Sequence, residues 1–323
     1  MLAAFLTTIF FSLSIICATR SAKIIGGTEA NFWRLALATT LLGVWAHIWG
    51  RGLTGDSLSV FVLSGVIGIG LGDVALFQAL PRLGSRLTIL MLNCLSAPFA
   101  ALIERIWLGT KLSAPQMLCA LVILIGVGIA LSPKEHLHIP RKIFWAGMAA
   151  SFFAALGNAF GMVLSRKAYA IVQTGGLHID GGTAAYQRLI GGLAVAGIFL
   201  LVVKRREIQN QLGFETAPLT RSSTTLSPSD GERDGVRGSS KEKWKRAWPW
   251  VVSNAVAGQT LGVSCLQWAL EYQPTGVVLP ITATTPLVAI PFAYFIEGEK
   301  PTLWSLVGGV IAVGGAVGLA LVK

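Results

Sequence analysis

Hydrophobic positions along the chain gather in long blocks, and short polar breaks separate these blocks. Each block is about 20 residues long, which is the length that a helix needs to cross a bilayer. The pattern predicts an all-α, polytopic membrane protein with ten transmembrane helices. The expected spans are residues 1–19, 31–49, 58–80, 85–107, 115–131, 143–166, 183–203, 249–272, 275–296 and 302–322.

The second half of the chain repeats the first. Residues 281–321 and 92–131 share one order of features: an apolar run, a short polar break and a second apolar run with spaced glycines. The first apolar run of each copy contains a proline, Pro286 in one and Pro98 in the other. The shared order indicates two copies of one membrane unit.

A second pair of segments, 26–37 and 181–191, also matches and places Arg34 opposite Arg188. Because five spans is an odd number, the second copy must enter the membrane from the opposite side. Inverted repeats are a recurring transporter design, with the binding site near mid-membrane where the repeats meet. The predicted division is a five-helix repeat, a loop and a second five-helix repeat, at residues 1–132, 133–142 and 143–323.

These motifs resemble those of the EamA type in the drug/metabolite transporter superfamily, whose members have ten helices. The resemblance covers nearly the whole chain. It rests on the duplicated proline and glycine-rich tail, on the arginine near the start of the second and seventh spans, and on Glu299 before paired glycines. It implies a transporter with both termini in the cytoplasm. The first repeat departs from the family pattern, because Thr110 stands where a glutamate is usual and Glu104 lies nearer the membrane.

The composition agrees with a membrane protein. The chain is 53% hydrophobic and 13% charged, whereas soluble proteins carry about 25% charged residues. Its formal net charge is +11. Lys and Arg flank the spans, where they set orientation, so nucleic acid is not an expected partner. The expected partners are the lipid bilayer and a small-molecule substrate, and the expected location is the cell (inner) membrane.

One connection, Lys204–Ala247, is long, polar and rich in Ser and Gly, which predicts a disordered loop within the second repeat. It also holds many of the Lys and Arg residues. Because basic connections stay in the cytoplasm, the charge pattern predicts that this loop is cytoplasmic and that the termini are outside. The charge pattern and the family resemblance therefore disagree on orientation.

Asp73 is an acid well inside a predicted span. Acids inside a membrane are costly and mark ion or proton pathways, so Asp73 is a candidate site for a coupling proton or for a cationic group of the substrate. The alternative is a structural ion pair with an arginine such as Arg34.

Residues 70–73 spell GxGD, which resembles the signature of intramembrane aspartyl proteases. Those enzymes need a second membrane aspartate, and the other aspartates here fall in predicted loops. Gly68, Gly72, Ala75 and Ala79 form a stripe that favours close helix packing instead. There is no nucleotide-binding loop, no nucleophile elbow and no metal-ligand spacing in the sequence. We therefore expect no enzyme activity, no cofactor and no metal.

Further polar residues recur at helical spacing on single faces of several spans. One interpretation is interhelical packing by polar groups. The other is a moderately polar cavity between the spans that binds substrate or ion. The candidates for such a cavity, besides Asp73, are Asn93, Asn158, Asn254, Gln259, Gln267, Trp268, Thr282 and Thr285.

Arg34 and Arg188 lie near the starts of their spans. Either they snorkel to the interface, or they form a gate or rim in two symmetry-related positions. The ninth span contains Pro280, Pro286 and Pro291, which remove backbone donors. This predicts a bent or broken helix whose freed carbonyls face substrate or water.

The sequence as a whole predicts a membrane transporter of small polar metabolites or drugs. It is expected to export them by alternating access, with energy from a proton or substrate gradient. The alternative, from another functional class, is a membrane scaffold that transports nothing and presents residues 204–247 to a partner.

Overall fold

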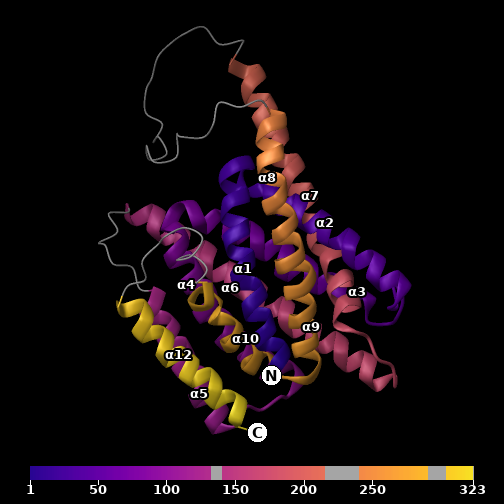
Figure 1. Cartoon of the computed structure of the whole chain (residues 1–323), viewed down its shortest axis with the longest axis vertical. Helices are drawn as coiled ribbons and strands as arrows, with labels where there is room; N and C mark the ends of the chain where they lie inside the picture. The colour runs from indigo at the N-terminus through magenta and orange to yellow at the C-terminus, as the bar shows by residue number, and fades with distance from the viewer. Residues whose placement is uncertain (132–139, 215–239, 290–302, 323) are drawn as a thin grey trace.

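The computed structural model describes residues 1–131, 140–214, 240–289 and 303–322, and the regular structure in these ranges is helical (Figure 1). Two π-helical segments, η1 (Val66–Leu71) and η3 (Ala255–Gly262), continue α3 into α4 and α8 into α9. The first half contains α1 (Leu2–Ile25), α2 (Gly27–Ile48), α3 (Leu58–Gly65), α4 (Gly72–Leu108) and α5 (Ala114–Leu131). The second half contains α6 (Arg141–Thr174), α7 (Gly181–Phe214), α8 (Ser240–Asn254), α9 (Val263–Tyr272), α10 (Thr275–Ala283) and α12 (Leu303–Leu321).

Seven helices among the described residues are long and apolar enough to cross a membrane. They fill the first, the third to seventh and the tenth predicted spans. The second span is α2, the eighth is built from α8, η3 and α9, and the ninth begins with α10. The predicted class, an all-α polytopic membrane protein, is therefore confirmed, and the ninth span is described as far as Ala289.

Prolines and glycines set several helix ends. Pro140 and Pro274 stand immediately before α6 and α10, where a missing backbone N–H leaves no helical hydrogen bond unmade. Gly109 follows α4 with φ of 69°, in the left-handed conformation that commonly ends a helix.

The chain reverses direction within α4, although helical turns continue through the connection. Contacts with α6 run antiparallel before the reversal and parallel after it: Ser64 with Ser165, Leu83 with Gly147, Ser96 with Ala155 and Glu104 with Arg166. The third and fourth predicted spans are therefore two membrane crossings, and the chain reverses direction between Leu83 and Ser96.

Matching helices of the two halves pack against each other. Helix α2 lies along α7, and α5 lies along α12; the second pair is seen side by side in Figure 1. Both pairs are antiparallel, as four contacts show: Gly43 with Tyr186, Phe32 with Gly197, Gly126 with Gly308 and Cys119 with Gly318. Two further contacts join helices that do not match each other: α1 packs on the α8–α9 helix, and α6 packs on the α3–α4 helix.

The crossing of α5 and α12 depends on glycine. A Cβ atom on Gly308 would lie 2.4 Å from the Gly126 carbonyl oxygen, and one on Gly126 would lie 2.5 Å from the Ala312 nitrogen. By contrast, Gly309 and Gly128 have open space where a Cβ would stand. Small residues of this kind let membrane helices approach closely.

We expect Gly308→Ala to destabilise the protein by about 1–3 kcal/mol, because the added methyl group must push two backbones apart. The measurement is thermal unfolding of the purified protein in a neutral detergent. Gly309→Ala, the neighbouring position with open space, is the control and should melt like wild type. Equal melting of the two variants would contradict the packing that the structure gives to this pair.

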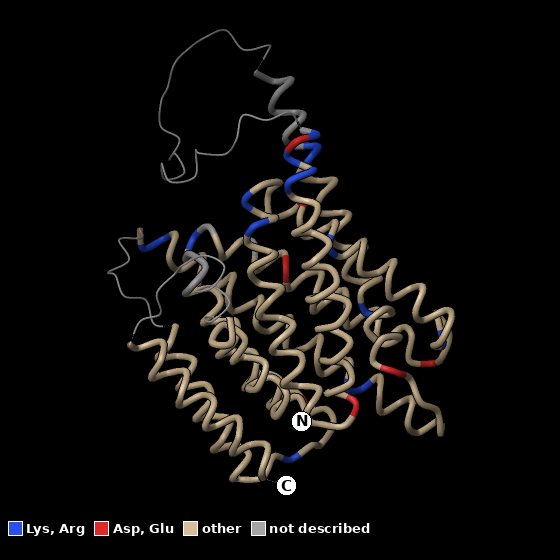
Figure 2. Tube along the Cα trace, viewed as in Figure 1, with Lys and Arg blue, Asp and Glu red and all other residues tan. Residues whose placement is uncertain are grey.

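Both ends of the range predicted to be disordered are helical. Helix α7 continues through Lys204 to Phe214, and α8 begins at Ser240. The prediction of disorder is corrected at these ends, because the two helices extend beyond their apolar runs; residues 215–239 lie outside the described residues. The extension of α8 projects from one end of the bundle and carries several basic residues, as Figure 2 shows.

Candidate functional site

Three polar side chains of α2 and α4 form the first part of the site. The Nη2 atom of Arg34 lies 3.5 Å from Oδ2 of Asp73, which is long for a charge-assisted hydrogen bond. The Nε atom of Arg34 donates to Oδ1 of Asn31 at 2.7 Å. Asp73 stands at the start of α4, directly after the π-helical segment η1. The ion pair with Arg34, one of the two alternatives for Asp73, is therefore present, and it is loose.

Arg188 of α7 belongs to the same region, because it interacts electrostatically with Asp73. Its side chain is 1% exposed, so it does not snorkel to the membrane surface. Among the described residues it makes one hydrogen bond, from Nη1 to the Met162 sulfur at 3.1 Å, and its Nε has no partner. A thioether is a weak acceptor. Arg188 is therefore a buried cation without a strong hydrogen-bonding partner.

Glycines bring three helices around Arg188. A Cβ atom on Gly65 would lie 1.7 Å from the Arg188 carbonyl oxygen, and one on Gly68 would lie 2.8 Å from its Nη2 atom. A Cβ on Gly68 would also lie 3.1 Å from the Cα of Gly161 on α6. The small-residue stripe through Gly68 thus packs helices closely, as predicted, and it borders the guanidinium. We call Arg34, Asp73 and Arg188 the central cluster.

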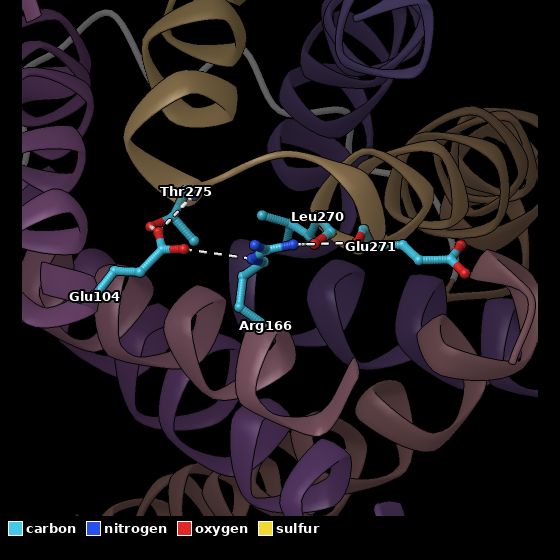
Figure 3. Close-up of polar contacts among 5 residues, drawn as sticks. All are labelled: Glu104, Arg166, Leu270, Glu271 and Thr275. Carbon is cyan, nitrogen blue, oxygen red and sulfur yellow. Dashed lines mark hydrogen bonds and ion pairs between the residues drawn. The ribbon is translucent and has the colours of Figure 1, made fainter. Parts of the chain in front are cut away.

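A second polar cluster joins the ends of four helices (Figure 3). Glu104 of α4 accepts hydrogen bonds from the backbone N–H of Thr275, at 2.7 Å, and from its hydroxyl group. Its other carboxylate oxygen lies 3.3 Å from Nε of Arg166. Arg166 Nη1 in turn donates to the carbonyl oxygens of Leu270, at 2.8 Å, and Glu271, at 3.1 Å. Glu104 is 1% exposed, so a buried carboxylate from one helix caps the first turn of α10.

Sequence reasoning found only part of this second cluster, which we call the Glu104 cluster. Glu104 was noted because it stands near the position where the family pattern has a glutamate. Arg166 and Thr275 were missed, since each lies at the end of a span, where polar residues are ordinary. Their separation from Glu104 in sequence gives no sign that the three meet in space.

Two of the predicted cavity residues hold helices together. Asn158 donates to Ser96 of α4 at 3.3 Å, and Asn254 accepts from Ser14 of α1 at 2.6 Å. These contacts match the packing interpretation.

Other predicted cavity residues have surroundings that differ from one another. Gln267 is fully buried, and neither atom of its amide group has a hydrogen-bond partner among the described residues. Gln259 is 9% exposed, and Asn93 is half-buried. Trp268 is 44% exposed and lines a groove at the protein surface. The structure therefore does not gather the candidates into one cavity.

The ninth span is broken, as its prolines predict. Helix α10 ends at Ala283, a turn follows, and helical structure resumes at Thr285. The carbonyl oxygens near the break are occupied by hydroxyl groups of the protein. Thr8 donates to Ile281, at 3.3 Å, and Ser12 donates to Thr285, at 2.9 Å.

The predicted residues Thr282 and Thr285 also bond locally, each to a carbonyl oxygen three residues earlier. The carbonyl oxygen that Pro286 frees is that of Thr282, four residues earlier, and the hydroxyl of Thr285 donates to it. That freed carbonyls of this span face substrate or water stays a prediction.

The motif residues are spread over the fold. Pro98 lines a cavity of about 320 Å³ between α4, α5 and α10, together with Pro280. Pro286 follows the break after α10. Glu299 and Pro291 lie outside the described residues. In the described part of the chain, no group of three or more His, Cys, Asp or Glu side chains is placed to hold a metal ion.

The sequence profile of the EamA-like transporter family matches residues 1–132 and 235–321. The chain belongs to the EamA-like transporter family. It is thus a membrane transporter of the drug/metabolite transporter superfamily. A solved structure described as "Crystal structure of protein" superposes with a TM-score of 0.65 over 98% of this chain and 97% of that chain. Its sequence is 14% identical to this chain, so the likeness concerns the fold alone. No curated protein matches the sequence.

In this EamA-like transporter, both polar clusters are built by helices from both halves. The central cluster takes Arg34 and Asp73 from the first half and Arg188 from the second. The Glu104 cluster takes Glu104 from the first half and Arg166 and Thr275 from the second. Any movement of one half against the other must therefore strain or rearrange these contacts.

Proposed function

We propose that this protein exports small polar metabolites or drugs across the cell (inner) membrane by alternating access, driven by a proton or substrate gradient. In this proposal the two halves are inverted repeats that rock about the central cluster. Asp73 carries the coupling proton, and Arg188 receives an acidic group of the substrate. The observation that carries the proposal is the buried guanidinium of Arg188, which lacks a strong partner.

The packing of matching helices supports the inverted arrangement. Helices α2 and α7 occupy equivalent places in the two repeats, and so do α5 and α12. If the repeats had the same orientation, each of these pairs would be parallel, but both are antiparallel. An inverted repeat places equivalent groups near a shared axis at mid-membrane, which is where Arg34 and Arg188 would then lie.

The chemistry of Arg188 supports an acidic substrate. A buried charge with only a weak hydrogen-bond partner costs several kcal/mol, so the burial of Arg188 points to a partner that is bound only part of the time. A guanidinium binds carboxylate or phosphate through two parallel hydrogen bonds. Asp73 is already shared with Arg34, at 3.5 Å, and the cluster therefore has two cations for one carboxylate.

The distribution of basic residues supports an orientation. Lys and Arg gather at the start of α8 (Figure 2), and basic segments remain in the cytoplasm. We propose that this end of the bundle is cytoplasmic. The Glu104 cluster, which lies at the opposite end, would then close the path on the outer side.

The test is to profile metabolites in cells and medium for wild type, Asp73→Asn and an empty vector, with equal amounts of protein in the membrane. Wild type should release one class of acidic metabolite that the empty vector does not release. Asp73→Asn should release at least about tenfold less, because it cannot carry the coupling proton. Release by Asp73→Asn that equals wild type at every pH would sink the role given to Asp73, and identical wild-type and empty-vector profiles would sink the transport proposal.

A further inference from the structure

A groove at the protein surface lies apart from the central cluster. Its volume is about 610 Å³. Its walls come from the end of α2, the start of α7, and η3 with α9. The side chains that decide its chemistry are Trp45, His178, Asp180, Trp268, Glu271 and Tyr272.

The polarity of the groove changes along its length. At one end its walls are apolar, with Leu41 and Leu261, both about two-fifths exposed. Toward the helix ends come the aromatic rings of Trp45 and Trp268, and the carboxylate of Glu271 lies beyond them. From residue 261 to residue 271 a helix rises about 15 Å, so the groove can hold an extended apolar chain with a polar group at its outer end.

The charged groups of the groove are acidic. The described residues that line it include Asp180, Glu271 and His178, and none of these described residues is Lys or Arg. Glu271 is 6% exposed, and its carboxylate lies 3.0 Å from Nε2 of His178, whose side chain is 66% exposed and can move aside. The lining therefore favours a cation.

Asp180 keeps its charge at neutral pH. Burial raises the pKa of its carboxyl, but hydrogen bonds from Thr183, Trp45 and Gly182 outweigh burial, and the pKa lies below its ordinary value. The same bonds hold the ring of Trp45 in place, since its Nε1 donates to Asp180 at 3.0 Å. An aromatic ring fixed beside a carboxylate is a favourable surface for an ammonium group.

We propose that this groove binds an amphiphile that carries one ammonium group and an apolar tail. The ammonium lies between Asp180 and Glu271, against the rings of Trp45 and Trp268, and the tail lies along Leu41 and Leu261. A phospholipid with an amine headgroup fits less well, because its phosphate would meet two carboxylates and no Lys or Arg among the described residues of the lining. An aromatic belt alone would explain the rings, but it would not explain two carboxylates among them.

The test measures how much dodecylamine the full-length protein binds in a neutral maltoside detergent, by native mass spectrometry. Dodecanol has the same tail without a charge, and dodecylphosphoethanolamine adds a phosphate. We expect one saturable dodecylamine per chain and at least tenfold weaker binding of both analogues. Trp268→Ala and Glu271→Gln should each weaken dodecylamine binding by about tenfold, as expected when a cation loses one aromatic or acidic partner.

Trp304→Ala is the matched control, because Trp304 of α12 is 66% exposed and lies outside the groove. It should bind dodecylamine like wild type. Equal binding of dodecanol would overturn the proposal, since the groove would then be only apolar, and equal or tighter binding of the phosphate analogue would make it a phospholipid site. Unchanged binding by Trp268→Ala would also overturn it.

Discussion

Replacing Glu104 by alanine is expected to destabilise the protein by about 3–5 kcal/mol, the cost of leaving one member of a buried ion pair without its partner. The change would remove the carboxylate that pairs with Arg166. It would also leave the first N–H and the hydroxyl of α10, both from Thr275, without their acceptor. Because these groups join α4, α6 and α10, we expect the loss to be felt by the whole bundle.

The measurement is thermal unfolding in a neutral detergent, with Glu29→Ala as the control. Glu29 also pairs with a basic residue, Lys204 at 3.2 Å, but the two side chains are 27% and 52% exposed. An exposed pair contributes about 0–1 kcal/mol, so Glu29→Ala should melt close to wild type. If the two alanine variants melted alike, Glu104 would not hold the cluster together. Glu104→Gln, which keeps an acceptor for Thr275 without the charge, should fall between Glu104→Ala and wild type.

The membrane spans could be predicted because each depends on its own residues. A run of apolar side chains forms a helix in lipid whatever surrounds it. Prolines likewise act on their own helix, and the break after α10 was predicted for that reason. The reversal within α4 was predicted as a boundary between two spans, because hydropathy falls at residues 81–84. This fall in hydropathy does not depend on whether the backbone there is helical.

The site could not be predicted as fully, because it depends on pairs of residues that the sequence holds apart. Arg188 lies near the start of α7, as predicted. Its position along the helix does not tell which residues of other helices surround it. Gly65 and Gly68 let two other helices close over it, and this burial distinguishes it from Arg34. Asn254 was a candidate for the cavity because it shares a helix face with other small or polar residues. In the structure it accepts a hydrogen bond from Ser14 of α1, across a contact between two helices.

The central cluster contains the buried Arg188, the Glu104 cluster contains Arg166, whose side chain is 21% exposed, and the two arginines differ in how well they are paired. Arg166 has a carboxylate and two carbonyl oxygens as partners. Arg188 donates one hydrogen bond, to a sulfur atom, and shares the charge of Asp73 with Arg34. Replacing a whole buried ion pair by apolar side chains of similar volume is often neutral or stabilising, by about 1–4 kcal/mol, whereas removing one partner of a buried pair is destabilising by about 3–5 kcal/mol. We expect a poorly compensated buried charge to follow the first case.

We therefore expect Arg188→Met to unfold at the same temperature as wild type or higher, and Arg166→Met to unfold at a clearly lower one. In transport we expect the opposite order, with Arg188→Met the more impaired of the two variants. For the metabolite that wild type exports, Arg188→Met should lose at least about thirtyfold in transport at low substrate concentration, because a charged partner of the substrate is worth about 2–5 kcal/mol. A stable Arg188→Met that transports normally would mean that no substrate group meets this guanidinium. An unstable one would mean that Arg188 holds the helices together. Only a stable variant without transport matches a cation whose strong hydrogen-bonding partner is the substrate.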